Sequence, residues 1–356
     1  MSTSKARWAA VTGHALFWPV VALIALLVAN TIYRPGFLSV EMKDGHLYGS
    51  LVDILRLAAP LILVGLGMTL VIATGGIDLS VGSVCAISGA IACLHISQQP
   101  DQNALGGVLV ALALGVGLSL VAGAWNGALV SIIGIQPIIA TLILMVAGRG
   151  LAQLITEGQI ITINSEPYKS VGVGYLLTLP LAIFIAAGVA LVVAAVTRRT
   201  ALGMIIESVG GNAEASRLAG IRSGRITFLV YVISAVCAGI AGFMITANVS
   251  SADGNAAGLW IELDAILAVV IGGTSLAGGR FSLGGTILGA LLIQTLTTTV
   301  YAMNISPQTS LLFKAVVVIA VCLIQAPAFR ARFARRPPAA PAAPLAADQP
   351  KEQVPA

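Results

Sequence analysis

A glycine-rich stretch that contains an acidic residue interrupts the apolar sequence between residues 54 and 94. It reads Thr74-Gly75-Gly76-Ile77-Asp78-Leu79-Ser80-Val81-Gly82. Irregular backbone is tolerated at membrane depth only where it is buried in protein or lines a cavity, because lipid offers no hydrogen-bond partners. Interrupted helices of this kind surround solute paths in membrane proteins. The stretch therefore predicts a helical hairpin that encloses a polar path.

The composition supports a protein embedded in lipid. Hydrophobic residues make up 58% of the 356 residues and charged residues only 9%, whereas soluble domains contain roughly 45–50% apolar residues. The net charge of +5 comes from cations scattered between apolar segments. This pattern favours contact with membrane lipid over binding of nucleic acid. The four cysteines form no C-x-x-C pair and the three histidines are isolated, so we expect neither a disulfide framework nor a metal site.

Apolar segments of roughly 20 residues can cross the hydrocarbon core. Ten candidate segments, of which 80–96 and 262–273 are shorter, predict an all-α, polytopic membrane protein of about ten transmembrane helices. The predicted spans are residues 14–32, 54–74, 80–96, 105–124, 137–155, 179–196, 226–247, 262–273, 286–303 and 311–324. The apolar stretch 124–135 fits either a lengthened helix or a re-entrant segment.

The distribution of Lys and Arg predicts the orientation, because cation-rich short loops stay cytoplasmic. With the N terminus inside, the cation-rich loop at residues 197–224 is cytoplasmic, and ten spans return the C terminus to the same side. We expect residues 1–13 to form a cytoplasmic segment and residues 14–326 a transmembrane domain. Residues 327–356 are rich in Pro and Ala and are expected to be a disordered cytoplasmic tail.

A second glycine-rich break lies at residues 272–280. Gly273 and Gly278 have the G-x-x-x-x-G spacing of a phosphate-binding loop, but Gly279 stands where that loop requires a lysine, so the sequence argues against an ATP site. We expect both breaks to line the solute path. The residues of this predicted path are Thr74, Gly75, Gly76, Asp78, Ser80, Gly272, Gly273, Thr274 and Ser275.

Asp78 has two compatible interpretations. An ionisable residue among membrane spans is a candidate for contact with a polar substrate. Alternatively, its carboxylate accepts hydrogen bonds from free backbone N–H groups at the start of the following helix. The sequence alone favours neither role.

The loop at residues 197–224 predicts two short helices separated by Gly210-Gly211, with Asn212 as the N-cap of the second. A small, partly apolar projection of this kind is suited to docking into a groove of another protein. An ordinary amphipathic connector would have a similar pattern.

Three stretches together resemble the permease subunits of ribose-type ABC sugar importers. They are residues 67–82, the loop at Gly211-Asn212, and residues 262–273, and the similarity extends from about residue 53 to residue 324. Within that family, residues 135–137, 140–153 and 252–260 most resemble a galactofuranose importer permease. The resemblance implies the ABC importer permease fold and the import of galactofuranose or a related monosaccharide.

The resemblance also implies partners in the bacterial inner membrane and on both of its sides. These are a second permease subunit (in a homodimer or heterodimer), two cytoplasmic ATP-binding subunits and a periplasmic sugar-binding protein. ATP and Mg²⁺ would be bound by the ATP-binding subunits, so this chain is expected to be a transport subunit without a cofactor or enzymatic activity. The residues matching the family's ATPase-coupling loop are Glu207, Gly210, Gly211, Asn212, Ala215, Ser216, Arg217 and Gly220.

Four cations on the predicted outer face are expected to dock the sugar-binding protein through an acidic rim, since charge pairing raises association rates. They are Arg34, Lys43, Arg56 and Lys169.

An ion-coupled secondary transporter of a small polar solute is the alternative function. Such a carrier would be expected to place paired acids, or a lysine and an acid, within its spans, and Asp78 has no obvious partner in the sequence. A membrane-embedded enzyme would need clustered His, Asp or Ser side chains at membrane depth, and none stands out.

Overall fold

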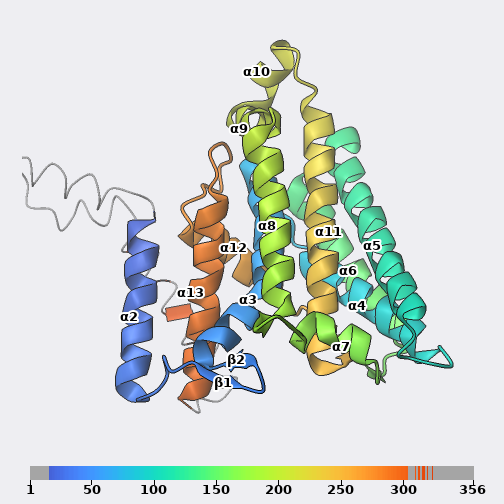
Figure 1. Cartoon of the computed structure of the whole chain (residues 1–356). Coiled ribbons are helices and arrows are strands. Elements are labelled where there is room, and N and C mark those ends of the chain that lie inside the picture. Colours follow the sequence, from blue (N-terminus) through green and yellow to red (C-terminus); the bar gives the residue numbers. More distant parts are fainter. Residues whose placement is uncertain are drawn as a thin grey trace, which may run out of the picture.

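The described part of the chain folds into a bundle of helices joined by loops, with three short antiparallel strand pairs among the loops (Figure 1). The computed structural model describes residues 16–303 and six positions beyond them (309, 312, 315, 316, 319 and 323). The predicted N-terminal segment 1–13, most of the predicted span 311–324 and the predicted tail 327–356 lie outside the described residues.

The helices follow one another along the chain with few irregular stretches. Their bounds are α2 Phe17–Tyr33, α3 Ser50–Ala73, α4 Val81–Ser97, α5 Leu105–Ala128, α6 Pro137–Ile155, α7 Glu166–Val173, α8 Leu181–Arg199, α9 Leu202–Gly211, α10 Ala213–Leu218, α11 Ser223–Val249, α12 Ile261–Ile271 and α13 Leu283–Ala302. A π-helical turn, η1 Leu129–Ile133, prolongs α5. The stretch after residue 124 is therefore a lengthened helix.

Six short strands pair antiparallel outside the helical bundle. β1 (Glu41–Lys43) pairs with β2 (His46–Tyr48), β3 (Ile161–Thr162) with β6 (Ser251–Ala252), and β4 (Tyr175–Leu176) with β5 (Leu179–Pro180). The β3–β6 pair joins loops that are far apart in sequence and so fixes the end of α11 beside the segment that precedes α7.

Helix α3 is the centre of the bundle. Every one of its residues from Leu61 to Ala73 is buried, and α11 and α13 pack against it. Helices α5, α6 and α8 have mostly exposed apolar faces: between 22% and 28% of their most hydrophobic windows is buried, compared with 72% for α3. This difference separates an inner layer packed against protein from an outer layer that suits lipid.

Glycines allow neighbouring helices to approach closely. Gly123 and Gly127 of α5 lie against α11, where a Cβ at Gly127 would come within 3.0 Å of the Phe228 carbonyl oxygen. Gly285 and Gly289 of α13 lie against the backbone of α12. Glycines four residues apart form such contacts because they place backbone on one helix face. Both pairs therefore serve packing within the subunit.

Nine of the ten predicted spans fall in the continuous described range, apart from residues 14 and 15 of the first, and each coincides with a helix. By length and composition, six helices within the described residues could cross a membrane: α3, α5 with η1, α6, α8, α11 and α13. Helices α2 and α4 have 17 residues each and α12 has 11, so α12 is only about 17 Å long. The predicted span at residues 262–273 is therefore too short to cross the membrane, and α12 enters the bundle as a half-helix.

The two ends of the bundle carry the two sets of predicted loops (Figure 1). Helices α9 and α10, from the loop predicted to be cytoplasmic, project at the top of the view. Strands β1 and β2 and helix α7, from loops predicted to be on the outer side, lie at the bottom. The described helices thus keep the predicted inner and outer loops at opposite ends.

Cysteine labelling in intact cells tests the orientation. A cysteine at Gln159, which is exposed in a predicted outer loop, should react with a membrane-impermeant maleimide, whereas a cysteine at exposed Ala219 should react only after lysis. The native Cys85, Cys93 and Cys237 are buried, and the fourth cysteine, Cys322, is replaced by Ser in both variants to keep the background low. Labelling of Ala219→Cys in intact cells would show that the orientation is opposite to the predicted one.

Candidate transport path and coupling surface

Asp78 is a buried anchor for the first glycine-rich break. Its carboxylate is 1% exposed. One carboxylate oxygen accepts hydrogen bonds from the Ser80 backbone N–H at 3.0 Å and the Ser80 hydroxyl at 2.6 Å. The other accepts from the Ser234 hydroxyl of α11 at 3.0 Å. The carboxylate therefore holds the entry to α4 and ties it to α11.

Other polar groups around the break bind it to two more helices. The Asn126 amide of α5 donates to the Ser80 hydroxyl at 2.8 Å. From α6, the Thr141 hydroxyl donates to the Ile77 carbonyl oxygen at 3.2 Å. Hydrogen bonds at membrane depth must be made within the protein. The break is thus a polar junction of α4, α5, α6 and α11, and this geometry matches the anchoring interpretation of Asp78.

Replacing Asp78 by Ala should destabilise the junction without preventing membrane insertion. The change removes three hydrogen bonds and leaves buried donors without an acceptor, which costs roughly 1–3 kcal/mol. We expect a lower thermal unfolding midpoint in detergent, and a smaller decrease for Ser234→Ala, which loses one of the three bonds. Equal midpoints for Asp78→Ala and the wild type would show that the carboxylate does not anchor the break.

The two glycine-rich breaks lie against each other. The Gly279 backbone N–H donates to the Ala73 carbonyl oxygen at 2.9 Å. Gly278 adopts φ +87°, and a Cβ there would come within 3.1 Å of the Gly75 nitrogen. A positive φ and a close backbone approach both require glycine. The second break therefore packs directly onto the end of α3.

The predicted path residues of the second break have different environments. Gly272 is buried against the backbone of Gly285, and Gly273 turns the chain with φ +88°. Thr274 is 3% exposed and accepts a hydrogen bond from the Ser282 N–H, whereas Ser275 is exposed.

Helix α9 packs against both breaks at Gly210. A Cβ at this position would overlap the Ala73 carbonyl oxygen and would lie 2.6 Å from the Gly279 nitrogen. The prediction that Gly210-Gly211 separates two helices is wrong, since α9 continues through both glycines to Gly211. The break follows at Asn212, whose side chain accepts from the Ala215 N–H at 2.9 Å and caps α10 as predicted. Gly210 is thus required for contact between segments and not for a turn.

The rest of the predicted coupling segment forms a compact projection. Ser216 is 6% exposed, and Gly220 ends the segment with φ +88°. Glu207 lies half-buried on α9. Arg217 pairs with Glu214 at 2.6 Å, and the hydrogen bond from the guanidinium lowers the pKa of the Glu214 carboxyl. This pair is exposed and adds local order more than stability.

A cavity of about 280 Å³ lies between the first break and this projection. Thr74, Gly75 and Gly76 line it together with Val209 and Ala213 of the projection. Tyr231 of α11 also lines it, and the Tyr231 hydroxyl has no hydrogen-bond partner among the described residues. Three predicted path residues therefore share a cavity with the predicted coupling segment, while Asp78 and Ser80 lie buried beside it.

Gly210 and Gly211 offer a matched pair of substitutions. Gly210→Val should force α9 away from both breaks, because a side chain there meets backbone on two sides. Such overpacking costs about 1–3 kcal/mol. Gly211→Val is the control, since a Cβ there meets nothing within 4 Å. We expect the thermal unfolding midpoint to fall for Gly210→Val only, and equal decreases for both variants would contradict the contact.

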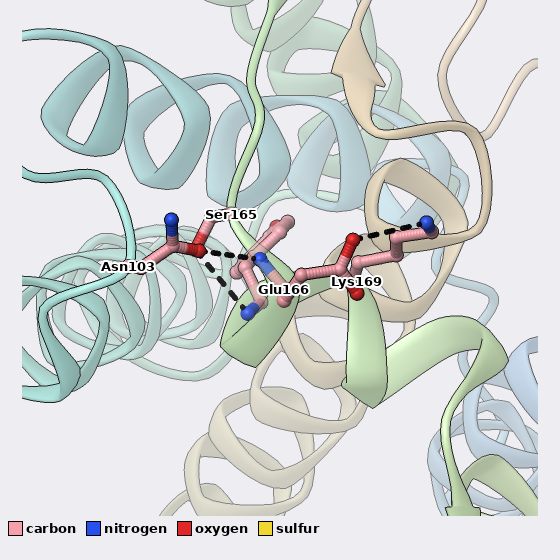
Figure 2. Close-up of polar contacts among 5 residues, drawn as sticks. Asn103, Ser165, Glu166 and Lys169 are labelled. Carbon is pink, nitrogen blue, oxygen red and sulfur yellow. Dashed lines mark hydrogen bonds and ion pairs between the residues drawn. The ribbon is translucent and has the colours of Figure 1, made fainter.

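The four predicted docking cations lie at the opposite end, and three have an acidic partner within the chain. Lys43 pairs with Glu41 at 2.9 Å, Arg56 with Asp53 at 3.3 Å and Lys169 with Glu166 at 3.3 Å; Arg34 is exposed. Figure 2 shows Lys169 beside Glu166 on α7. There the Asn103 side chain accepts from the Glu166 N–H at 2.9 Å and holds α7 to the α4–α5 loop.

Sequence reasoning missed two charged side chains inside the bundle. Arg149 of α6 donates to the carbonyl oxygens of Ala257 at 2.6 Å and Gly254 at 3.3 Å, which fixes the loop before α12. Glu262 is 5% exposed and lies against Gly82 of α4. The position of Arg149 within a predicted span could have indicated a buried contact, since charged residues within membrane spans are rare and need partners.

The fold defines a transport subunit of the membrane. It has a buried central helix beside two glycine-rich breaks, outer helices that suit lipid, and a projection at one end. A family profile described as "Branched-chain amino acid transport system / permease component" matches residues 50–322. The chain belongs to this family of permeases.

Three relatives illustrate the similarity. The chain is 48% identical to the galactofuranose transporter permease protein YtfT of Escherichia coli over 88% of this chain and 91% of the relative. It is 44% identical to the fructose import permease protein FruF of Bifidobacterium longum, over 88% of each chain. It is 36% identical to the ribose import permease protein RbsC of Haemophilus influenzae, over 85% of this chain and 90% of the relative. No solved structure matches significantly.

Proposed function

We propose that this chain is the membrane-spanning permease subunit of an ATP-driven, binding-protein-dependent importer of galactofuranose or a related monosaccharide. The observation that carries the proposal is the similarity over nearly the whole chain to relatives named for galactofuranose, fructose and ribose. The profile's description names branched-chain amino acids. We favour a sugar as the substrate, because the three relatives are named for sugars and are between 36% and 48% identical to this chain.

In this proposal the projection formed by α9 and α10 docks into a cytoplasmic ATP-binding subunit, which holds ATP and Mg²⁺. The contact of Gly210 with Ala73 and Gly279 supports it, because a displacement of α9 would reach both breaks without an intervening side chain. Packed backbone moves as a rigid unit and so transmits force over short distances. The breaks at residues 74–80 and 272–275 would then open and close the inner part of the sugar path.

The opposite end would receive a periplasmic sugar-binding protein, with Arg34, Lys43, Arg56 and Lys169 as candidate contacts. Because three of these cations already pair with acids of this chain, an acidic rim would have to compete for them, and the attraction should act mainly on the association rate. We propose a second permease subunit beside this one in the bacterial inner membrane, with residues 1–13 and 327–356 on the cytoplasmic side.

An ion-coupled carrier is the alternative. The surroundings of Asp78 argue against it, since the groups that bind its carboxylate are hydroxyls and a backbone N–H. Within the described residues no lysine or arginine forms an ion pair with it. A fixed, fully hydrogen-bonded carboxylate is poorly suited to exchanging an ion during each transport cycle.

Reconstitution in proteoliposomes separates the two functions. The permease, its ATP-binding subunits and the binding protein should together import labelled galactofuranose, ribose or fructose only with ATP inside, and import should persist with a protonophore. Labelled leucine is the contrasting substrate. Import without ATP that collapses with the protonophore would overturn the proposal. Raising the salt concentration should slow import at limiting binding protein, and charge removal at Lys43 and Lys169 should reduce that salt dependence.

A further inference from the structure

A second, larger cavity opens at the end of the bundle that carries α7. It has a volume of about 440 Å³, within the range typical of small-molecule sites. Helices α3, α11, α12 and α13 and the loop at residues 250–260 enclose it. Its polar lining residues include Arg56, Asn248, Ser251, Asp253, Asp264 and Gln294. The predicted path residues lie at the two glycine-rich breaks and none of them lines this cavity, so the cavity is separate from the breaks.

Several polar groups of this cavity are already held in place. The Arg56 guanidinium donates to the Asn248 side-chain oxygen at 2.7 Å and pairs with Asp53. One Asp253 oxygen accepts from the backbone N–H groups of Asn255 at 2.8 Å and Ala256 at 3.2 Å. Such contacts fix the side chains before a ligand arrives, and preorganised groups lose less entropy on binding.

Gln294 differs from these groups. It lies on α13, eight residues before the helix ends at Ala302, or about 12 Å along the helix axis. Its side chain lines the cavity, yet it makes no hydrogen bond with the described residues. A side-chain amide has two donors and an acceptor, and an amide without partners is costly on a membrane helix. An arriving polar ligand would supply the missing partners.

The lining matches a small neutral polyol. Hydroxyl groups of a sugar both donate and accept, and the cavity offers carboxylate and amide oxygens beside guanidinium and amide N–H groups. Apolar side chains complete it, among them Leu57, Pro60, Leu61 and Met244, against which the C–H faces of a sugar ring can pack. The lining carries charges of both signs, Arg56 beside Asp253 and Asp264, and a sugar hydroxyl can hydrogen-bond to either kind.

We propose that this cavity is a monosaccharide-binding site of the permease itself, in which Gln294 hydrogen-bonds sugar hydroxyls after release from the binding protein. The proposal rests on the sugar import proposed above. It adds a site on the outer half of the path, distinct from the two breaks near α9.

Saturation-transfer NMR tests direct binding. The probes are D-galactose, D-fructose and D-ribose, each added to the permease complex in lipid nanodiscs without binding protein. The wild type should transfer saturation to the ring protons of at least one sugar. Gln294→Leu should weaken that binding about 5- to 10-fold, the value of one or two lost hydrogen bonds. Ala256→Trp, on an exposed lining position, should fill the cavity and remove the signal.

Gln159→Leu is the matched control, because Gln159 is exposed in a loop and lies outside the cavity lining. It should leave binding unchanged. In proteoliposomes, Gln294→Leu should lower sugar import about 5- to 10-fold while stimulation of ATP hydrolysis by loaded binding protein persists, a combination that a general folding defect would not give.

The outcomes separate the two proposals. A wild-type complex that imports sugar, while Gln294→Leu and Ala256→Trp bind and import as well as it does, would overturn the binding site alone. Absence of saturation transfer from every sugar to the wild-type complex would also overturn the site. A wild-type complex that imports none of the sugars with ATP would overturn both proposals.

Discussion

The hydrogen bonds of the Asp78 carboxylate are the interaction on which the arrangement of the bundle depends. An interrupted helix within a membrane leaves backbone donors without partners unless the protein supplies acceptors. The Asp78 carboxylate is such an acceptor for the Ser80 N–H, and it also binds α11 by accepting a hydrogen bond from the Ser234 hydroxyl. Asn126 and Thr141 extend the same junction to α5 and α6. Four helices are therefore held together at the break, because one buried acidic residue supplies the hydrogen-bond acceptors that the break needs.

Glycine contacts convert that junction into a mechanical connection. Gly210 of α9 touches the end of α3 and the second break, and Gly278 of the second break touches the first. Because these contacts join backbone to backbone, no flexible side chain can absorb a movement of α9. A subunit that pushes on the α9–α10 projection would therefore act on both breaks together. Under the proposed function, this is the route by which an ATP-binding subunit docked on the projection would act on the breaks.

Polar side chains follow the same division between inner and outer ends. The cavity near α9 contains the Tyr231 hydroxyl and the outer cavity contains the Gln294 amide, and neither group has a hydrogen-bond partner among the described residues. Between them the hydrophobic half of α3 is completely buried. This alternation of polar cavity, packed core and polar cavity is the arrangement expected when a solute is admitted from one side at a time.

The sequence by itself determined the membrane class, the helices that coincide with nine predicted spans, the glycine-rich breaks, the Asn212 cap and the family. These features are local: hydropathy, glycine in place of side chains and capping chemistry act within a few residues. Only the tertiary structure decided that Gly210 serves contact and not a turn, and that Arg149 holds the loop before α12. It also placed Arg56, Asn248, Asp264 and Gln294 around one cavity. These four residues come from four different helices, and their proximity depends on how backbones pack at glycines, which no local pattern encodes.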